Sequence, residues 1–361
     1  MTEADVIRVR GVVLPEGEHR DVYVVHGRVT YDVPSGGAST VAEGWIVPGL
    51  VDAHCHVGLG EHGGIPEDVQ EQQATSDRDA GALLLRDCGS PSDTRWIQER
   101  DNLPRLIRAG RFLARPKRYM RNFAHEIEPE ELPAYMKQEA RRGDGWVKLV
   151  GDWIDRDIGD LAPCWPRAAL EEGIAAAHEH GARVTAHVFG EDALPDLIGA
   201  GIDCIEHGTG LGPDLIATMA ERRVALVPTA WQLNNFPKYA EQAGEKFPEY
   251  SRHMLALFEQ RKQTIAAAYE AGVPMYAGSD AGAVLPHGLI GEEIAELVRH
   301  GMSAYDALGA ASWRAREWLG HNPTLEEGAP ADLVVYPADP TLDVGVLREP
   351  SRVILRGRVV R

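Results

Sequence analysis

The sequence has few cysteines, no long apolar run and no excess of positive charge. Its 55 acidic residues outnumber the 37 basic ones, and a net charge of -18 disfavours nucleic acids and anionic membranes as partners. No apolar run approaches the roughly 20 residues that a membrane-spanning helix needs. The four cysteines contain no C-x-x-C pair, which excludes an evident disulfide framework or structural zinc site. They are Cys55, Cys88, Cys164 and Cys204.

Charged residues interrupt the N-terminal thirty positions, so the apolar core of a signal peptide is missing there. Hydrophobic content of 44%, charged content of 25% and a mean hydropathy of -0.27 are ordinary for a globular protein, which we expect to be cytoplasmic. The expected partner is a small-molecule substrate. A helix face at residues 289–298 could contact a second copy in a homo-oligomer, or it could equally cover the domain.

Both ends of the chain have β character. Short β-rich runs flank His26-Gly27, and such a glycine-containing turn predicts a hairpin. We expect residues 1–49 and 324–361 to form one small β-domain, with residues 50–323 inserted between its halves. The strand candidates of this domain are residues 6–13, 22–25, 28–31, 332–336, 353–355 and 359–360.

Between these ends, short apolar runs alternate with helical stretches, several of which have proline in the first turn. Eight such alternations predict a (β/α)8 barrel, with a doubly wound open sheet as the alternative. Residues 232–251 are expected to form a long loop on the active-site side. The strand candidates are residues 51–56, 82–86, 106–113, 146–150, 183–187, 203–207, 224–227 and 274–280. The helix candidates include residues 66–80, 129–142, 166–180, 192–200, 213–222 and 252–271.

The first barrel strand candidate ends in a His-x-His pair. Pro48 cannot donate to a central ladder, so the strand should begin near Leu50. Side chains at i and i+2 of a strand share a face, so His54 and His56 can bind one metal while Cys55 points away. A single His-x-His motif occurs at a strand end by chance at least as often as it binds a metal. Further ligands are therefore needed to support a metal site.

Four more residues of metal-ligand type lie in or directly after later strand candidates. In a closed barrel the C-terminal strand ends converge on one mouth, so residues far apart in sequence can meet there. Imidazole and carboxylate suit zinc, manganese, iron or cobalt. Each histidine alone could be an ordinary hydrogen-bonded residue, but their joint placement predicts a metal site. The four residues are Lys148, His187, His207 and Asp280.

With these motifs the sequence resembles the amidohydrolase superfamily, and in detail its imidazolonepropionase-like and Xaa-Pro or Xaa-Arg dipeptidase branch. The resemblance implies a barrel plus a small β-sandwich made of both termini. It covers nearly the whole chain, through residues 48–56, Glu206-His207-Gly208, residues 278–282, residues 327–335, residues 353–358 and His287-Gly288.

The resemblance also implies two divalent ions, most simply zinc, with Lys148 as a bridging carbamate derived from CO2. Only a neutral amine attacks CO2, and apolar neighbours together with nearby cations favour that form. The alternative is a cationic Lys148 paired with Asp152 or Asp155 above a single metal. By resemblance, the more buried ion takes His54, His56 and Asp280, and the second takes His187 and His207.

The implied reaction is hydrolysis of an amide-type C–N bond in a small N-acyl amino acid, dipeptide or cyclic amide. A metal-bridged hydroxide would attack the carbonyl, and Asp280 would carry its proton to the leaving nitrogen. A mononuclear deaminase of ring amines is the alternative, but such enzymes usually have glutamate three residues after the fifth-strand histidine, where this chain has Gly190 and only then Glu191. A non-catalytic relative would typically have lost ligands that this chain retains.

Aromatic and histidine side chains after the strands are the candidates for substrate binding. His125 lies where the dipeptidase branch often has Gly-His-Gly, although the neighbours here are alanine and glutamate. Aromatic residues at a barrel mouth favour an apolar or ring-bearing substrate, although a tryptophan there often only packs. The candidates are Tyr119, His125, Trp153, Trp231 and His287.

Overall fold

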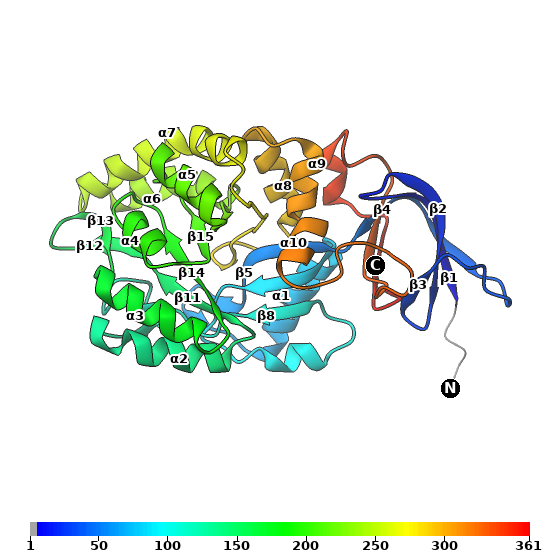
Figure 1. The fold of residues 1–361 in the computed structure, drawn as a ribbon, viewed down its shortest axis with the longest axis horizontal. Coiled ribbons are helices and arrows are strands. Elements are labelled where there is room, and N and C mark those ends of the chain that lie inside the picture. Colours follow the sequence, from blue (N-terminus) through cyan, green and yellow to red (C-terminus); the bar gives the residue numbers. More distant parts are fainter. Residues whose placement is uncertain (1–5) are drawn as a thin grey trace.

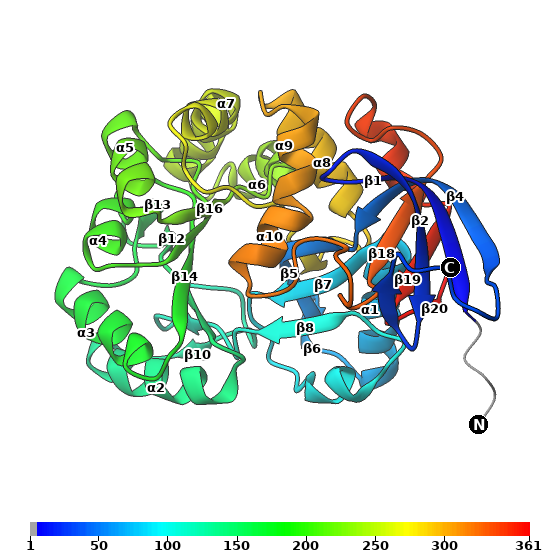
Figure 2. The ribbon, with the colours of Figure 1, turned by 45° about the vertical axis from the view of Figure 1, so that its right-hand side comes forward.

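The computed structural model describes residues 6–361, which form a (β/α)8 barrel beside a smaller β-domain (Figure 1). A view turned by 45° shows helices around the outside of the barrel and the β-domain against one side of it (Figure 2). Across the described chain, no helix combines the length and apolar character required to cross a membrane.

The β-domain is one sheet that folds over its own core, as expected for a β-sandwich. Its strand order is β20-β19-β18-β4-β1-β2-β3. The edge strand β3 also bonds to the segment before β18, because Val29 N donates to Ala329 O and Ala331 N donates to Gly27 O, both at 2.9 Å. The strands are β1 (Ile7–Val13), β2 (Glu18–Val25), β3 (Arg28–Thr30), β4 (Ser39–Pro48), β18 (Leu333–Tyr336), β19 (Arg352–Leu355) and β20 (Arg358–Val359).

The barrel strands run parallel, in the orders β5-β7-β8 and β9-β11-β14-β15-β16. Residues 274–280 occupy the eighth position, where Tyr276 N donates to Leu226 O (3.1 Å) and Ala53 N donates to Ala277 O (2.8 Å). The first bond joins this segment to β16, and the second joins it to the first strand, β5. β8 and β9 together occupy the third position, because β8 pairs with β7 and β9 pairs with β11. The strands are β5 (Leu50–Gly60), β7 (Ala82–Asp87), β8 (Arg105–Arg108), β9 (Leu113–Ala114), β11 (Trp146–Val150), β14 (Arg183–Val188), β15 (Cys204–His207) and β16 (Ala225–Val227).

Helices cover the barrel with their apolar faces; α2, for example, buries Leu132, Met136 and Ala140. The helices are α1 (Glu67–Asp79), α2 (Leu132–Arg142), α3 (Arg167–His178), α4 (Leu194–Gly199), α5 (Pro213–Arg222), α6 (Phe236–Ala243), α7 (Pro248–Glu270), α8 (Ile290–Arg299), α9 (Ala304–Ala310) and α10 (Trp313–Trp318). Shorter strands are β6 (Gly63–Gly64), β10 (His125–Glu126), β12 (Asp152–Asp155), β13 (Asp160–Pro163) and β17 (Ala281–Ala283).

The expected long loop at residues 232–251 is wrong in part, because most of it is helical. It contains a 3-10 turn at Gln232–Asn235 and α6, and α7 begins at Pro248. Pro237 and Pro248 lie in the first turns of these helices, where a missing N–H costs nothing. The prolines therefore start helices here, although they suggested a loop in the sequence.

One histidine joins α7 to β13 and to the loop between β14 and α4. His253 Nδ1 lies 2.9 Å from Asp160 Oδ1, and its Nε2 lies 2.8 Å from Glu191 Oε2. The hydrogen bond to Glu191, helped by Asp160 and opposed by partial burial, raises the pKa of His253 to about 9. The imidazolium is therefore the favoured form at neutral pH.

We predict that this contact stabilises the fold fully below the unfolded-state pKa of about 6.5 and is lost as pH rises through about 9. The melting temperature of His253→Gln should lie on the order of 1–2 °C below that of the native chain at pH 6. The gap should close by pH 10, as measured by calorimetry across this range. A gap that stays constant with pH would contradict the role of the imidazolium.

Candidate active site

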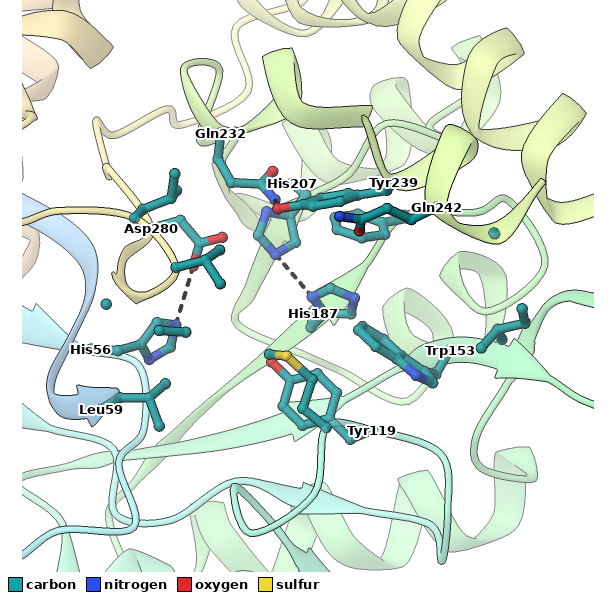
Figure 3. Close-up of a pocket in the computed structure, with 18 of the residues that line it drawn as sticks. His56, Leu59, Tyr119, Trp153, His187, His207, Gln232, Tyr239, Gln242 and Asp280 are labelled. Atoms are coloured by element: carbon teal, nitrogen blue, oxygen red, sulfur yellow. Dashed lines mark hydrogen bonds and ion pairs between the residues drawn. The ribbon is translucent and has the colours of Figure 1, made fainter. Parts of the chain in front are cut away.

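Six side chains of metal-ligand type meet at the C-terminal mouth of the barrel. His56, His187, His207 and Asp280 are labelled in Figure 3. All six line one cavity of about 460 Å³. They come from β5, β11, β14 and β15 and from the end of the eighth strand segment, so the fold brings together residues more than 200 positions apart. They are His54, His56, Lys148, His187, His207 and Asp280.

The first cluster consists of His54, His56 and Asp280. His54 Nε2 lies 3.2 Å from His56 Nε2 and 3.1 Å from Asp280 Oδ1, which in turn lies 3.2 Å from His56 Nε2. His56 Nδ1 donates to Gly89 O (2.8 Å), and His54 Nδ1 donates to Glu206 (2.7 Å). With the proton on Nδ1, each neutral ring presents its Nε2 lone pair to the other ring. Two lone pairs and a carboxylate facing one another fit a divalent cation.

The second cluster consists of His187 and His207. His187 Nδ1 lies 3.0 Å from His207 Nε2, and His207 Nδ1 lies 2.7 Å from Thr229 Oγ1. The ring centroids of His54 and His207 are 5.3 Å apart, so the two clusters adjoin. These facing nitrogens are two further possible metal ligands next to the first cluster.

Lys148 is 1% exposed and lines the same cavity. Within residues 6–361 its side chain has no hydrogen bond or ion pair. The two acidic residues considered as its partners are engaged elsewhere: Asp152 accepts from the backbone N–H of Gly190 (2.6 Å), and Asp155 pairs with Arg118 (2.7 Å). The alternative in which a cationic Lys148 forms an ion pair with Asp152 or Asp155 is therefore not observed in this structure.

The ends of three consecutive strands are conformationally strained. His207, Thr229 and Asp280 have φ angles of 67°, 48° and 56°, in the left-handed region that non-glycine residues rarely occupy. Strain of this kind clusters at functional sites, where the surrounding structure imposes it. At His207 the left-handed conformation also interrupts the alternation of side chains between the two faces of the strand. Glu206 and His207, although adjacent in sequence, can therefore both contact the site.

Glu206 is a residue whose role sequence reasoning missed. It is fully buried, and it accepts hydrogen bonds from His54, from Arg86 Nη2 (2.7 Å) and from the Thr185 hydroxyl. Burial alone would raise its pKa, but Arg86 and His54 hold the pKa of Glu206 well below the usual range. The Arg86 guanidinium lies over the Trp146 ring at 4.5 Å. This buried ion pair fixes the tautomer and orientation of His54.

Two of the five substrate-binding candidates, Tyr119 and Trp153, line the cavity with their ring centroids 4.8 Å apart. Figure 3 shows both on the side of His187. Sequence reasoning missed lining residues that belong to the helical segment after β16. They include Gln232, Tyr239, Gln242, Phe247 and Tyr250.

The structure places the other three candidates outside the cavity lining. His125 Nε2 lies 3.2 Å from Glu139 on α2, and His287 Nδ1 lies 2.7 Å from Asp77 on α1. Trp231 has its backbone N–H bonded to Glu293 (2.7 Å), and its ring does not line the cavity. All three residues follow barrel strands, as the sequence predicted. The directions of their side chains, however, are set by residues on other elements of the fold.

Taken together, the closed barrel and its histidine-lined mouth define a barrel hydrolase of the amidohydrolase type. Residues 45–360 match the amidohydrolase family, and the chain belongs to that family. It is 58% identical over 354 residues to the Uncharacterized protein Rv2915c of Mycobacterium tuberculosis (strain ATCC 25618 / H37Rv), covering 98% of this chain and 95% of the relative. The family supports a hydrolase that acts on amide-type bonds.

Several solved structures share the fold along almost the whole chain. An Xaa-Pro dipeptidase with bound methionine has a TM-score of 0.83 at 21% identity, covering 98% of this chain and 99% of the other. A putative prolidase from Bifidobacterium longum has a TM-score of 0.82 at 22% identity, covering 98% and 94%. An A. niger ochratoxinase has a TM-score of 0.81 at 18% identity, covering 99% and 96%. These likenesses confirm the expected barrel with a β-sandwich.

We predict that Arg86→Met will destabilise the fold by about 3–5 kcal/mol, because it leaves the Glu206 carboxylate buried without a counterion. Adding Glu206→Gln to this variant removes the uncompensated charge and should restore much of the free energy of unfolding. Urea denaturation of the native chain, both single variants and the double variant measures this. A double variant no more stable than Arg86→Met would contradict the assignment of the ion pair.

Proposed function

We propose that this chain is a metal-dependent hydrolase that cleaves an amide-type C–N bond in a small substrate. The observation that carries the proposal is the facing set of His54 Nε2, His56 Nε2 and Asp280 Oδ1, all within 3.2 Å of one another beside His187 and His207. These five residues would hold two divalent ions, most simply zinc, with manganese, iron or cobalt as alternatives. When bound, such ions would activate a water molecule and polarise the substrate carbonyl.

Asp280 is the proposed proton carrier. Its contacts with His54 and His56 use Oδ1, which leaves Oδ2 to take a proton from the attacking water and deliver it to the leaving nitrogen. The side chain is 18% exposed and lines the cavity, so a substrate can reach it. The products are a carboxylic acid and an amine.

We further propose that Lys148 is a carbamate that links the two metals. A buried ammonium that makes no ion pair is costly, and no carboxylate of the described chain lies within ion-pair distance of Lys148. Attack of the neutral amine on CO2, with loss of one N–H proton to solvent, would convert the side chain into an anion. That anion would supply one oxygen ligand to each metal.

Deamination of ring amines by a single metal has less support. The carboxylate that would carry the proton after the fifth strand is absent from position 190, and the neighbouring Glu191 is bound to His253 (2.8 Å). Asp280 supplies the one carboxylate that lines the cavity among residues 6–361. Hydrolysis of an N-acyl amino acid, dipeptide or cyclic amide is therefore the better proposal.

Protein grown with bicarbonate and added zinc or manganese should contain close to two metals per chain. We predict that Lys148→Ala will hold one metal or none, because the carbamate bridge is lost. Elemental analysis measures this directly. Lys246→Ala is the matched control, because this lysine lies exposed at the rim of the cavity, and it should keep both metals. A single metal per chain, unaffected by Lys148→Ala, would refute the bridge.

The hydrolase activity itself is tested by amine release from N-acyl amino acids, dipeptides and lactams. Activity should disappear on chelation and return with added metal, and Asp280→Asn should lower kcat by at least about 100-fold. Release of ammonia from ring amines, without amide cleavage, would instead favour the deaminase.

A further inference from the structure

The cavity has almost no charge beyond its six metal-type residues. In the part of the chain that the structure describes, Lys246 is the one other charged residue that lines it. Lys246 is exposed at the rim, with Nζ 5.2 Å from the ring centroid of Phe247. An exposed ammonium of this kind is hydrated and screened, so it provides only a weak partner for a substrate carboxylate.

Charged residues just outside the lining are already paired with one another. Arg118 precedes Tyr119 in the sequence, and its guanidinium binds Asp155 (2.7 Å) and Trp153 O (3.0 Å). His253, on α7, is held between the carboxylates of Asp160 and Glu191. The charges of Arg118 and His253 are therefore already compensated by carboxylates outside the cavity lining.

The walls themselves suit a flat apolar group. Tyr119 and Trp153 meet edge to face at 4.8 Å, and the Trp153 ring lies 5.4 Å from that of His187. A substrate ring held here would lie next to the second metal cluster, in the arrangement that aromatic side chains favour. Figure 3 shows Leu59 beside His56, on the other side of the cavity. Val284 and Leu285 add to the aliphatic lining.

The remaining polar groups of the lining are neutral. Gln232 is 4% exposed, and its Nε2 donates to the Tyr239 hydroxyl (3.2 Å). Its Oε1 is buried and has no hydrogen-bond partner within the described residues, so the side chain adds a neutral amide and no charge to the lining. Burial raises the pKa of Tyr119 and raises the pKa of Tyr239 to about 12, so both phenols stay uncharged.

We propose that the substrate is an uncharged amide bearing an aromatic ring, such as an anilide or an aryl-substituted cyclic amide. The inference rests on the proposed hydrolase function and narrows its substrate class. A free dipeptide brings an ammonium and a carboxylate, and an N-acyl amino acid brings a carboxylate. Beyond the metal-type residues, the cavity offers these charges only the exposed and screened Lys246. Water adds to the carbonyl carbon, the C–N bond breaks, and the proton carried by Asp280 leaves with the arylamine.

The preference of the cavity for an uncharged substrate is called the charge rule below. Two ligands of nearly identical shape test it: 4-nitroacetanilide, which is neutral, and N-acetyl-4-aminobenzoate, which carries a carboxylate in place of the nitro group. Metal-loaded protein should hydrolyse the neutral compound with kcat/KM roughly 100-fold higher. Calorimetric titration of chelated protein, which cannot turn over, should show at least tenfold tighter binding of the neutral compound. Equal or tighter binding of the carboxylate would overturn the proposal.

A charge added to the wall gives a second test. Ile154 lines the cavity on β12 and is partly exposed. Ile154→Arg should improve binding of the carboxylate compound relative to the nitro compound by about tenfold, whereas Ile154→Met should keep the native preference. An unchanged ratio in the arginine variant would contradict the charge rule.

The two proposals fail in different ways. If metal-loaded protein binds the neutral compound more tightly but cleaves none of the anilides, lactams, dipeptides or N-acyl amino acids, amide hydrolysis is refuted and the charge rule for binding stands. If it cleaves dipeptides faster than anilides, the substrate class is refuted and the hydrolase stands.

Discussion

Two imidazole nitrogens and a carboxylate oxygen face one another at the mouth of this barrel, and the surrounding structure fixes their positions. His56 is oriented by Gly89 O at 2.8 Å, and His54 is oriented by Glu206 at 2.7 Å. Glu206 is in turn held by Arg86, deep inside the barrel. The proposed metal ion would bind among these three groups, so the buried residues that orient the two histidines also determine the geometry of the proposed site.

The barrel makes this arrangement available because it closes. The eighth segment bonds to β5 through Asp280 N and His54 O at 2.7 Å, which places Asp280 against the first strand. Behind it, Asp52 accepts from Ser279 N at 3.0 Å and from His54 N at 3.1 Å, joining the same two segments. The β-domain is joined to the barrel where β4 runs on through Gly49 into β5. The proposed division into residues 1–49 with 324–361, and 50–323, follows this junction.

The sequence pattern predicted side-chain positions correctly where the local backbone geometry determines which way a side chain points. Alternation along β5 was enough to place His54 and His56 on one face, and most expected helices are present within a few residues. The pattern did not predict side-chain positions that depend on contacts with residues far away in the sequence. His287 is turned to Asp77, and the helical segment after β16 is positioned by Glu293, which accepts from two of its backbone N–H groups. Glu206 was noted only as part of a motif, because its function depends on Arg86, 120 positions away.

The most direct test of the account is X-ray diffraction from crystals of metal-loaded protein, recorded on both sides of the zinc absorption edge. The account predicts two anomalous peaks about 3.5–4 Å apart. One should lie among His54, His56 and Asp280, and the other beside His187 and His207, with electron density from Lys148 Nζ reaching both. A single peak, or metal bound away from the barrel mouth, would contradict it.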